Sequence, residues 1–361
     1  MQIIQDRRAL HRIPELGSQL PLTMQYIKQL LEGLNCTVFE PAEGSLCAWF
    51  DFGANTAIAF RADADALPIA EKTGLEFASQ HPGQMHACGH DGHMAILLEL
   101  ARRLSGRQNM KKNILLVFQC AEETTGGALA ICKSGVFERY AVEAIFGLHL
   151  WPGLAEGVIA SRKNELMARS CELHVTVTGR SVHIAKAEQG MDALAAGVAF
   201  YTKVMELERK LPKGIFHVLN FGKMESGTVC NAISGKTVLE GSLRAFQDEI
   251  FEDLRGRIRQ AGREVEQATG CTVEITMTDG YPAVMNPSAL YDRVRSIVPF
   301  SELEVPSMTA EDFSWYQRYL PGMFFFLGAG NTPALHSSNF DFNEQILSKG
   351  ADFFEHLALC F

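Results

Sequence analysis

The sequence predicts an α/β protein with a mostly parallel sheet, helices on both faces of that sheet, and a smaller α+β domain inserted into it. Its 361 residues exceed the usual size of one domain, so two domains are expected. Apolar runs alternate with helical patterns in the first part of the chain, which is typical of a parallel sheet. The middle of the chain instead follows the β-α-β-β-α-β order of the ferredoxin-like unit.

In the first part, amphipathic helices are expected at residues 3–10 and 22–34, with a break marked by Pro14, Gly17 and Pro21. A third helix is expected at Met94–Leu104, and Asp91 is a suitable N-cap for it. A fourth begins within Gly127–Lys133. Buried strands are expected at Thr56–Phe60, Asn113–Phe118, Ala144–Leu150 and, near the C-terminus, Met323–Gly328.

In the middle part, Cys171–Thr178 alternates between apolar and polar residues as a half-exposed strand does. The remaining elements expected here are helices at about 191–210 and 248–268 and strands at His217–Lys223, Thr237–Phe246 and Thr272–Thr278. We therefore expect residues 167–280 to form the inserted domain, and residues 1–166 and 281–361 to form the larger one.

Composition excludes several classes of function. The net charge is −9, from 33 basic and 42 acidic residues, and no block of like charge predicts binding to nucleic acid or to a membrane surface. No apolar run is long enough to span a membrane, and the N-terminus lacks the apolar core of a signal peptide. The nine cysteines include no CxxC pair, which favours a reducing compartment. A cytoplasmic protein is expected.

One short loop carries four side chains that can bind metal, namely His86, Cys88, His90 and His93. A thiol and three imidazoles suit soft or borderline divalent ions. In an extended chain Cys88 and His90 would point the same way, so we expect them to share a site. Taken alone, the loop is also compatible with an ordinary helix N-terminus.

Two adjacent carboxylates, Glu122 and Glu123, follow the strand expected at Asn113–Phe118. Adjacent carboxylates repel each other unless cations compensate their charge. In extended backbone they would face opposite sides, so we expect one to bind metal and the other to accept a proton from metal-bound water. A lone Glu-Glu pair is more often a solvated turn, so this interpretation depends on position.

Position supports it, because potential ligands follow several of the expected strands. The residues just past a strand end are Asp63, Asp65, Glu122, Glu123, His149 and His336. Ligands of an open parallel sheet bind along the edge formed by the carboxyl ends of its strands. Four separate segments thus bring ligands to one edge, and the sequence predicts a metal site there.

The ligand set indicates two ions. Cys88, His90, Glu123, His149 and His336 are five potential ligands, whereas a closed structural zinc site needs only four. A bridging ligand and a water would hold two metals ~3.5–4 Å apart. Such a pair lowers the pKa of bound water and polarises a carbonyl, which is what the hydrolysis of an amide requires.

Two other hypotheses stay open at this point. Cys88 could be the nucleophile of a metal-free thiol amidase, with a nearby His or Glu as base. Alternatively, the chain could be a non-catalytic protein with a structural zinc and a binding cleft. The clustered histidines disfavour the first hypothesis, and the presence of Glu122 disfavours the second.

These motifs resemble those of the M20 metallopeptidase family, in the amidohydrolase branch that includes hippurate hydrolases, N-acetyldiaminopimelate deacetylases and auxin-conjugate hydrolases. The resemblance spans nearly the whole chain in the family's order. It implies a zinc-peptidase-like catalytic domain with an inserted lid. The matching segments are RRALHRIPELG (7–17), RADADALPI (61–69), MHACGHDGHMA (85–95), AEE and GGA (121–128), FGLH (146–149), GTVCNAI (227–233), EGSLRAF (240–246), TAEDFSW (309–315), PGMFFFLG (321–328) and LH (335–336).

The resemblance also implies roles for the residues near the metals. Cys88 would be the bridging thiolate of two divalent ions, with Mn, Zn, Co and Ni all suitable. Glu122 would be the general base that takes a proton from the bridging water and returns it to the leaving amine. Asp63 and Asp312 would orient the ligands from behind. The two metal shells would be completed by His90, Glu123, His149 and His336.

In the inserted domain, the resemblance implies a lid that also forms a homodimer. His183 would stabilise the tetrahedral oxyanion, across the dimer in one arrangement. Asn231 and Arg244 would bind the carboxylate of the substrate, with Arg244 using a bidentate fork. The expected partners are therefore a small-molecule N-acyl amino acid and a second copy of the chain.

The chain departs from the family's pattern in two places. Arg180-Ser181-Val182-His183-Ile184-Ala185 stands where the family has a Gly-Gly-His-Ala run, and Ser18 or Leu20 stands where it has an acidic residue. The expected substrate is a small N-acyl amino acid, with N-acetyl-diaminopimelate as the first choice. Hippurate-like aromatic N-acyl amino acids and short dipeptides are the alternatives.

Overall fold

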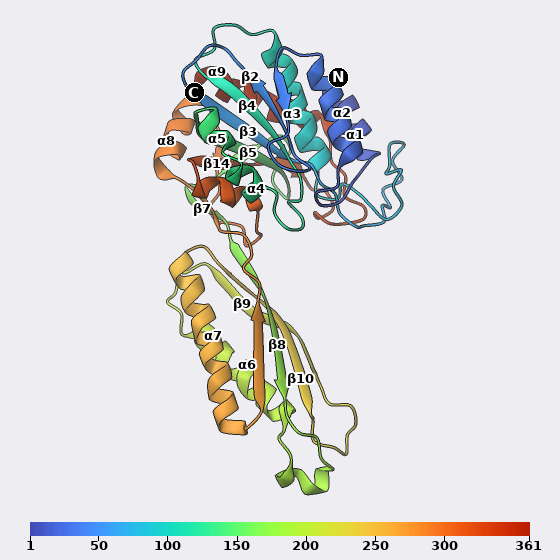
Figure 1. Cartoon of the computed structure of the whole chain (residues 1–361), viewed down its shortest axis with the longest axis vertical. Coiled ribbons are helices and arrows are strands. Elements are labelled where there is room, and N and C mark those ends of the chain that lie inside the picture. Colours follow the sequence, from blue (N-terminus) through green and yellow to red (C-terminus); the bar gives the residue numbers. More distant parts are fainter. The chain divides into compact units, whose positions relative to one another are not determined.

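The computed structural model describes residues 1–361, which form two compact units (Figure 1). The large unit comprises Met1–Leu166, Met285–Pro306 and Glu311–Phe361, and the small unit comprises Met167–Val284 and Ser307–Ala310. The small unit thus extends past residue 280, where we expected it to end. Ser307–Ala310 belongs to it because Ala168 N–H donates to Thr309 O (2.9 Å) and Met167 pairs with Ser307 in a β-bridge.

The large unit is built on a mixed, mostly parallel sheet of eight strands in the order β1-β2-β4-β3-β5-β14-β6-β13. The central strands β4, β3, β5 and β14 are parallel to one another, whereas β1, β2 and β4 pair antiparallel, as do β14 and β6. The expected fold class is confirmed. The strands are β1 (Thr37–Phe39), β2 (Leu46–Phe50), β3 (Ala57–Asp63), β4 (Asn113–Gln119), β5 (Val142–Pro152), β6 (Ile159–Ser161), β13 (Ser301–Glu302) and β14 (Gly322–Gly330).

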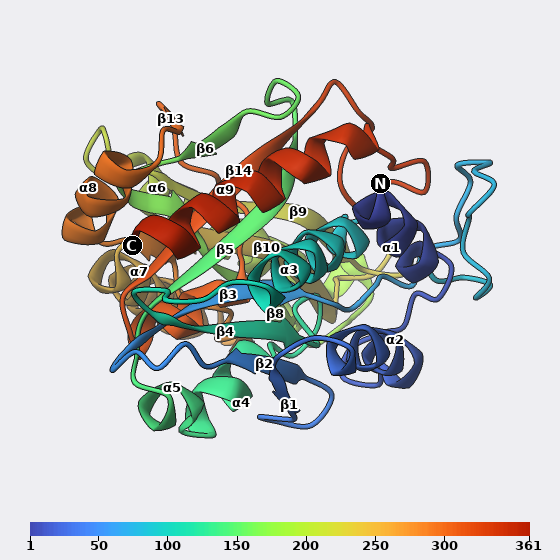
Figure 2. The same ribbon diagram turned by 90° about the horizontal axis from the view of Figure 1, so that it is seen from above.

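Helices cover both faces of this sheet because its central strands are apolar on both sides. Alternate residues of β4, including Ile114 and Leu116, join the core beneath α1, α2, α3 and α9. Figure 2 shows α3 and α9, which are in contact, crossing one face of the sheet. On the other face, Phe313 of the 3-10 helix η2 packs on Phe324 of β14. The helices are α1 (Gln2–His11), α2 (Pro21–Glu32), α3 (His90–Ser105), α4 (Ala128–Lys133), α5 (Val136–Arg139), α8 (Ser288–Ile297), α9 (Leu347–Cys360), η2 (Asp312–Arg318) and η3 (Glu344–Ile346).

The small unit is an antiparallel sheet of four strands in the order β11-β8-β10-β9, packed against two helices. This is the ferredoxin-like arrangement that the order of elements predicts. Its strand β8 alternates as expected: Leu173 and Val175 are buried, whereas Glu172 and His174 are exposed. The elements are β8 (Arg169–Thr178), η1 (Ile184–Gln189), α6 (Ala193–Arg209), β9 (His217–Ser226), β10 (Lys236–Ala245), α7 (Asp248–Thr269) and β11 (Thr272–Met277). A separate two-stranded sheet pairs β7 (Asn164–Met167) with β12 (Val284–Asn286).

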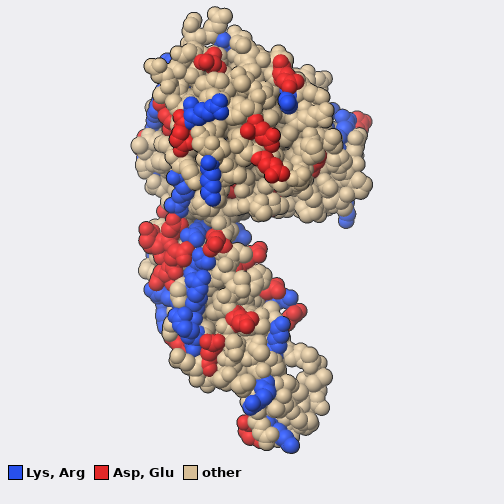
Figure 3. Space-filling view, viewed as in Figure 1, with Lys and Arg blue, Asp and Glu red and all other residues tan.

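Surface charge is mixed in sign. On the face in Figure 3, basic side chains gather in a band over α7, with acidic side chains beside them. Ion pairs such as Arg257–Asp253 (2.8 Å) and Lys203–Glu264 (2.9 Å) neutralise charge on the helices of the small unit. No helix of the structure combines the length and the apolar character needed to cross a membrane. All nine cysteines are free thiols.

Candidate metal centre

The carboxyl ends of the parallel strands meet at one edge of the large unit's sheet, and the candidate ligands lie there. Asp63 is the last residue of β3, and Glu122 and Glu123 follow the end of β4. His149, however, does not follow a strand end as we expected. It lies inside β5, because this strand pairs with β14 as far as Pro152, with His149 opposite Phe326.

The metal-binding loop enters α3 through a sharp turn at Gly89, whose φ of +84° is left-handed. Two expectations are therefore wrong. Cys88 and His90 are not in extended chain, because Gly89 turns between them. Asp91 is not the N-cap, which is Gly89, because the Asp91 carboxylate instead accepts from Arg7 Nε (2.9 Å). A Cβ at Gly89 would lie 2.8 Å from Leu150 Cδ1, so the leucine side chain would have to shift, and the positive φ itself favours glycine.

Two neighbouring groups of side chains could each hold a metal ion, because within each group the potential ligand atoms all lie within 4.8 Å of one another. One group is Cys88, Glu123 and His336, and the other is Asp63, His90, His93 and His149. The groups adjoin, because Cys88 Sγ lies 3.5 Å from His149 Nε2, and His90 Nε2 lies 3.8 Å from Glu123 Oε1. The structure thus brings together all five residues that the sequence marks as metal ligands.

The ring hydrogen bonds of His90 and His149 determine which nitrogen each presents. His90 Nδ1–H donates to Asp65 O (2.8 Å), and His149 Nδ1–H donates to Leu150 O (2.7 Å). In the neutral imidazole, Nε2 then carries the lone pair. The Nε2 atom of His90 is buried and has no hydrogen-bond partner. Both histidines are therefore prepared to bind a metal through Nε2.

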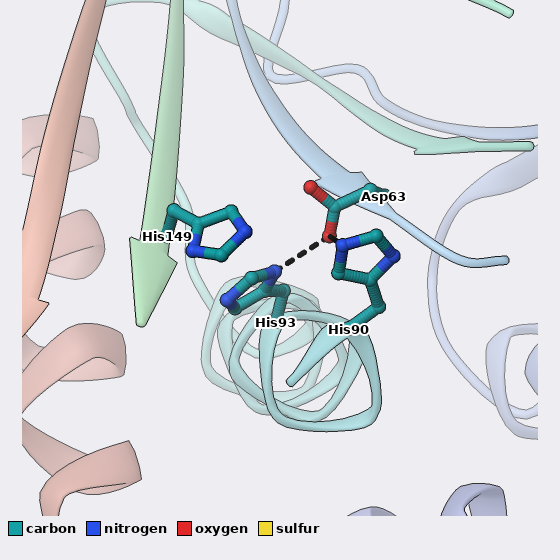
Figure 4. Close-up of side chains that lie close together, drawn as sticks. All are labelled: Asp63, His90, His93 and His149. Carbon is teal, nitrogen blue, oxygen red and sulfur yellow. Dashed lines mark hydrogen bonds and ion pairs between the residues drawn. The ribbon is translucent and has the colours of Figure 1, made fainter. Parts of the chain in front are cut away.

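His93 stands in the same group but has no nitrogen left for a metal (Figure 4). Leu150 N–H donates to its Nε2 (2.8 Å), so Nδ1 carries the proton and donates to Asp63 Oδ1 (2.5 Å). The second oxygen of Asp63 accepts from Arg61 (2.7 Å). Asp63 is therefore hydrogen-bonded to both His93 and Arg61, and its role of orienting the ligands stays a prediction.

Glu122 and Glu123 are held by their backbone. Both N–H groups donate to the carboxylate of Asp65, at 2.9 and 3.1 Å. The two residues lie in a turn that follows Ala121, a non-glycine residue with φ of +58°, and not in extended chain. The expectation that they face opposite sides is therefore wrong, since both carboxylates lie within 4.8 Å of His90 and of each other.

Beneath these residues lies Arg61, which is 1% exposed and which we did not single out from the sequence. Its guanidinium contacts Asp63 (2.7 Å), Glu311 (3.0 Å) and Asp312 (2.8 Å). The alternation of Arg61 and Asp63 along one strand face is the signal that could have identified it. Asp312, which we expected to act from behind, also accepts from Gln119 Nε2 (2.7 Å), so it lies in this buried network.

The site holds more carboxylates than cationic side chains. Burial, together with the charges of Glu311 and Glu123, raises the pKa of Glu122 well above its ordinary value. Burial and then the charges of Glu123 and Glu122 likewise raise the pKa of the Cys88 thiol. Divalent cations would relieve both effects by compensating the excess negative charge. The donor set, the presented Nε2 atoms and this charge excess fit a pair of divalent metal ions.

The remaining expected site residues lie in the small unit. His183 caps η1 by accepting from Ala185 N–H at its Nδ1 (3.2 Å), and it is exposed. His183 forms an isolated β-bridge with Ala232, and Asn231 O accepts from Ile184 N–H (2.9 Å), so His183 and Asn231 belong to adjacent segments. Arg244 is half-buried on β10, where its Nη1 donates to Met308 O.

Comparisons with known proteins agree with this architecture. The chain is 32% identical to an uncharacterised hydrolase of Staphylococcus saprophyticus, over 98% of this chain and 96% of the relative. A crystal structure from methicillin-resistant Staphylococcus aureus has a TM-score of 0.93 at 29% identity, covering 99% of this chain and 96% of that one.

A second solved structure bears on the metal site. The Bacillus subtilis YXEP protein, described as a dinuclear metal binding peptidase from the M20 family, has a TM-score of 0.85 at 29% identity. The match covers 99% of this chain and 97% of that one. The model of peptidase family M20/M25/M40 matches residues 59–359. This chain therefore belongs to the M20/M25/M40 peptidase family and is a hydrolase.

Proposed function

We propose that this hydrolase binds two divalent metal ions and cleaves the amide bond of small N-acyl amino acids. The observation that carries the proposal is the buried, unpartnered Nε2 of His90, which lies 3.8 Å from Glu123 Oε1 in a site with an excess of carboxylates. An unpartnered buried nitrogen of this kind costs free energy unless a ligand binds it. The dinuclear metal binding described for YXEP, a relative over nearly the full length, supports two ions.

The two groups of side chains suggest how the ions would be held. Cys88, Glu123 and His336 would bind one ion, and His90 and His149 the other. Cys88 would bridge them, because its Sγ lies near both groups. Such ions act as Lewis acids that polarise an amide carbonyl and lower the pKa of water.

Glu122 is the residue we assign as general base. Its carboxylate is buried beside those of Glu311 and Asp312, all within 4.8 Å of one another, and burial raises its pKa. A carboxylate with a raised pKa accepts a proton from water more readily and can still deliver it to the leaving amine nitrogen. The hydrogen bonds from Glu122 and Glu123 N–H to Asp65 fix the backbone from which both side chains extend.

Substrate recognition is assigned to the small unit. A guanidinium and an amide, from Arg244 and Asn231, suit the free carboxylate of an N-acyl amino acid. The hydrogen bond to Met308 O restricts the rotation of the Arg244 head group, which lowers the entropy that binding must remove. His183 is proposed to donate a hydrogen bond to the developing oxyanion. N-acetyl-diaminopimelate is the first substrate to test, followed by hippurate-like aromatic compounds and short dipeptides.

We further propose that the small unit forms a homodimer. Leu194, Val198 and Tyr201 are 47%, 48% and 39% exposed, and their spacing places them on one face of α6. Strand β9 is at the edge of its sheet, with one side unpaired within that sheet. An exposed apolar helix face beside an open strand edge suits a partner of the same fold.

The alternative of a metal-free thiol amidase is less well supported. Burial and two neighbouring carboxylates raise the pKa of Cys88, so its thiol stays protonated when no cation is present. A nucleophilic cysteine needs the opposite, a lowered pKa. Full activity after exhaustive metal removal, together with inactivation by a thiol alkylator, would favour this alternative.

The decisive experiment combines metal analysis with Glu122→Gln. We expect two ions per chain by elemental analysis in both proteins and a loss of at least about a thousandfold in kcat for the variant, because general base catalysis and the reactivity of the attacking water are both lost. Normal turnover by Glu122→Gln would overturn the base assignment. A panel of N-acetyl, N-benzoyl and dipeptide substrates then identifies the acyl group, and a clear preference for long peptides would overturn the substrate class.

A further inference from the structure

We infer that Arg7 is a positioning residue of the metal centre: it fixes the segment that carries His336 against the helix that begins with His90. This inference rests on the proposed two-ion site. It concerns the ion assigned to Cys88, Glu123 and His336. The binding of this ion would depend on Arg7 more strongly than the binding of the other ion does.

The Arg7 side chain comes from α1 and is 1% exposed. Its Nε donates to Asp91 Oδ2 (2.9 Å), in the first turn of α3 and next to His90. Its Nη2 donates to Asp341 Oδ1 (2.8 Å), and its Nη1 lies 3.2 Å from Glu344 Oε1. One guanidinium therefore connects the start of α3 to the segment of residues 336–346.

Aromatic rings fix the orientation of this guanidinium. Its central carbon lies 4.3 Å from the centroid of the Phe342 ring and 4.9 Å from that of Phe77. Phe342 itself packs on α3, since its Cζ is 2.9 Å from the position that a Cβ on Gly92 would occupy. A planar, delocalised cation matches both the carboxylates and the rings, which a lysine ammonium would not.

The histidines of the site differ in how much support they have of their own. His90 and His149 are buried, and each is oriented by a hydrogen bond from its Nδ1 to a backbone carbonyl. The side chain of His336 is 51% exposed, and its backbone has a φ of +64°, which is unfavourable for a residue with a side chain. Its Nε2 lies 3.2 Å from Glu123 Oε1, which is itself a proposed ligand, so the position of His336 also depends on what holds the surrounding segment.

Contacts from several parts of the large unit hold that segment. His336 N–H donates to Ala87 O (2.8 Å), immediately before Cys88. Lys72 N–H donates to Ser338 O (2.7 Å). Arg7 adds a contact through Asp341 and Glu344, and its guanidinium reaches Asp91 of α3 as well. Its neighbour Arg8 also pairs with Glu344 but does not contact Asp91. Loosening the Arg7 contact should displace His336 relative to Cys88 and Glu123.

The experiment measures the affinity of both sites for Co²⁺ by competition with a chromogenic chelator, in the full-length chain. We expect two ions for wild type, and for Arg7→Lys an unchanged affinity for one and a loss of about 10- to 100-fold for the other, as is typical when residues that orient ligands are changed. The visible absorption of the more weakly bound Co²⁺ ion should also change in Arg7→Lys. Arg102→Lys is the matched control, since Arg102 also joins α1 to α3, through Asp6, but contacts neither Asp91 nor the 336–346 segment.

A second variant covers the case in which Arg7→Lys does not fold. Asp341→Asn combined with Glu344→Gln keeps the buried Arg7–Asp91 pair and removes the two carboxylates of the 336–346 segment that face Arg7, together with the pair between Glu344 and Arg8. Arg8→Gln, which loses only the Arg8–Glu344 pair, is the control for that second effect. We expect the double variant to weaken the same ion. Adding Arg7→Lys or the double change to His336→Ala should have no further effect on the ion that remains.

The possible failures are distinguishable. Wild-type protein that binds fewer than two ions would overturn the proposed function and this inference with it. Two ions in wild type, with equal affinities in wild type and in the folded variants, would overturn the inference alone. Equal weakening of both ions by Arg7→Lys would also overturn it, because Arg7 would then support the fold in general and not His336.

Discussion

His93 donates its Nδ1–H to Asp63 Oδ1 at 2.5 Å. This bond occupies one of the two ring nitrogens through which His93 could otherwise bind a metal. His93 lies within 4.8 Å of the ligand atoms of His90 and His149 and would pass for a third histidine ligand by distance alone. Its second nitrogen, however, accepts from Leu150 N–H (2.8 Å). Hydrogen bonding and not proximity therefore decides which imidazoles can bind metal.

This relationship predicts that His93→Gln keeps both metal ions while His149→Gln loses one. Removing the His93 ring leaves the buried Asp63 oxygen without its donor, so we expect the free energy of unfolding to fall by about 1–3 kcal/mol. Elemental analysis of dialysed protein and urea denaturation measure the two effects. Loss of an ion from His93→Gln would show that His93 is a ligand.

Asp65→Asn should reduce kcat by about 10- to 100-fold with both ions retained. The Asp65 carboxylate accepts the N–H groups of both Glu122 and Glu123, and an asparagine can accept only with its single oxygen. The NH₂ group of the asparagine would then face one of these backbone N–H groups, and two donors repel each other. The glutamate that carries this N–H would shift from its position. Steady-state kinetics beside metal analysis test this, and an unchanged kcat would contradict it.

Much of the site could be predicted from the sequence because parallel strands place their carboxyl ends on one edge. Asp63, Glu122 and Glu123 follow from that rule alone. The inserted unit also follows, because the alternation of Leu173 and Val175 with polar residues differs from the buried strands around it.

Local backbone conformation could not be predicted in the same way. The left-handed turn at Gly89 and the positive φ of Ala121 redirect the residues that follow them, so the extended-chain arguments for Cys88 and for Glu122 were wrong. Such turns are stabilised by tertiary contacts, for example the Asp65 carboxylate, that no local pattern reveals. For Arg61, the alternation with Asp63 along the strand indicates a shared face, but the sequence does not show that Glu311 and Asp312 meet the same guanidinium.

The His11–Asp91 pair predicts a pH dependence of stability. Burial alone would lower the pKa of His11, but the Asp91 charge and hydrogen bonds to Asp91 and Glu71 raise it from 6.5 to about 9. Because the pKa of His11 is higher in the folded state, protonated His11 stabilises the protein. This contribution is complete at a pH below the pKa of the unfolded state, 6.5, and is lost as the pH rises through about 9. The shift corresponds to a contribution on the order of 3 kcal/mol.

Denaturation of wild type and His11→Gln between pH 6 and 10 measures this contribution. We expect the stability difference between the two proteins to be largest near the acid end and to shrink towards pH ~9 and above. A difference that stays constant across this range would mean that His11 is neutral in the folded protein and that its bond to Asp91 is an ordinary hydrogen bond.

The proposed dimer makes a prediction about the exposed face of α6. Val198 is 48% exposed between Leu194 and Tyr201, so Val198→Glu would bury a charge in the interface and weaken association by roughly 30-fold or more. Glu206→Lys is the control, because Glu206 lies about a third of a turn away from this stripe on the same helix. Sedimentation velocity should show a dimer for wild type and for the control, and a shift towards monomer for Val198→Glu. A monomeric wild type, or a Val198→Glu variant that dimerises as strongly, would rule out this face, since a partner that covers α6 cannot accommodate an unpaired carboxylate among apolar side chains without a measurable loss.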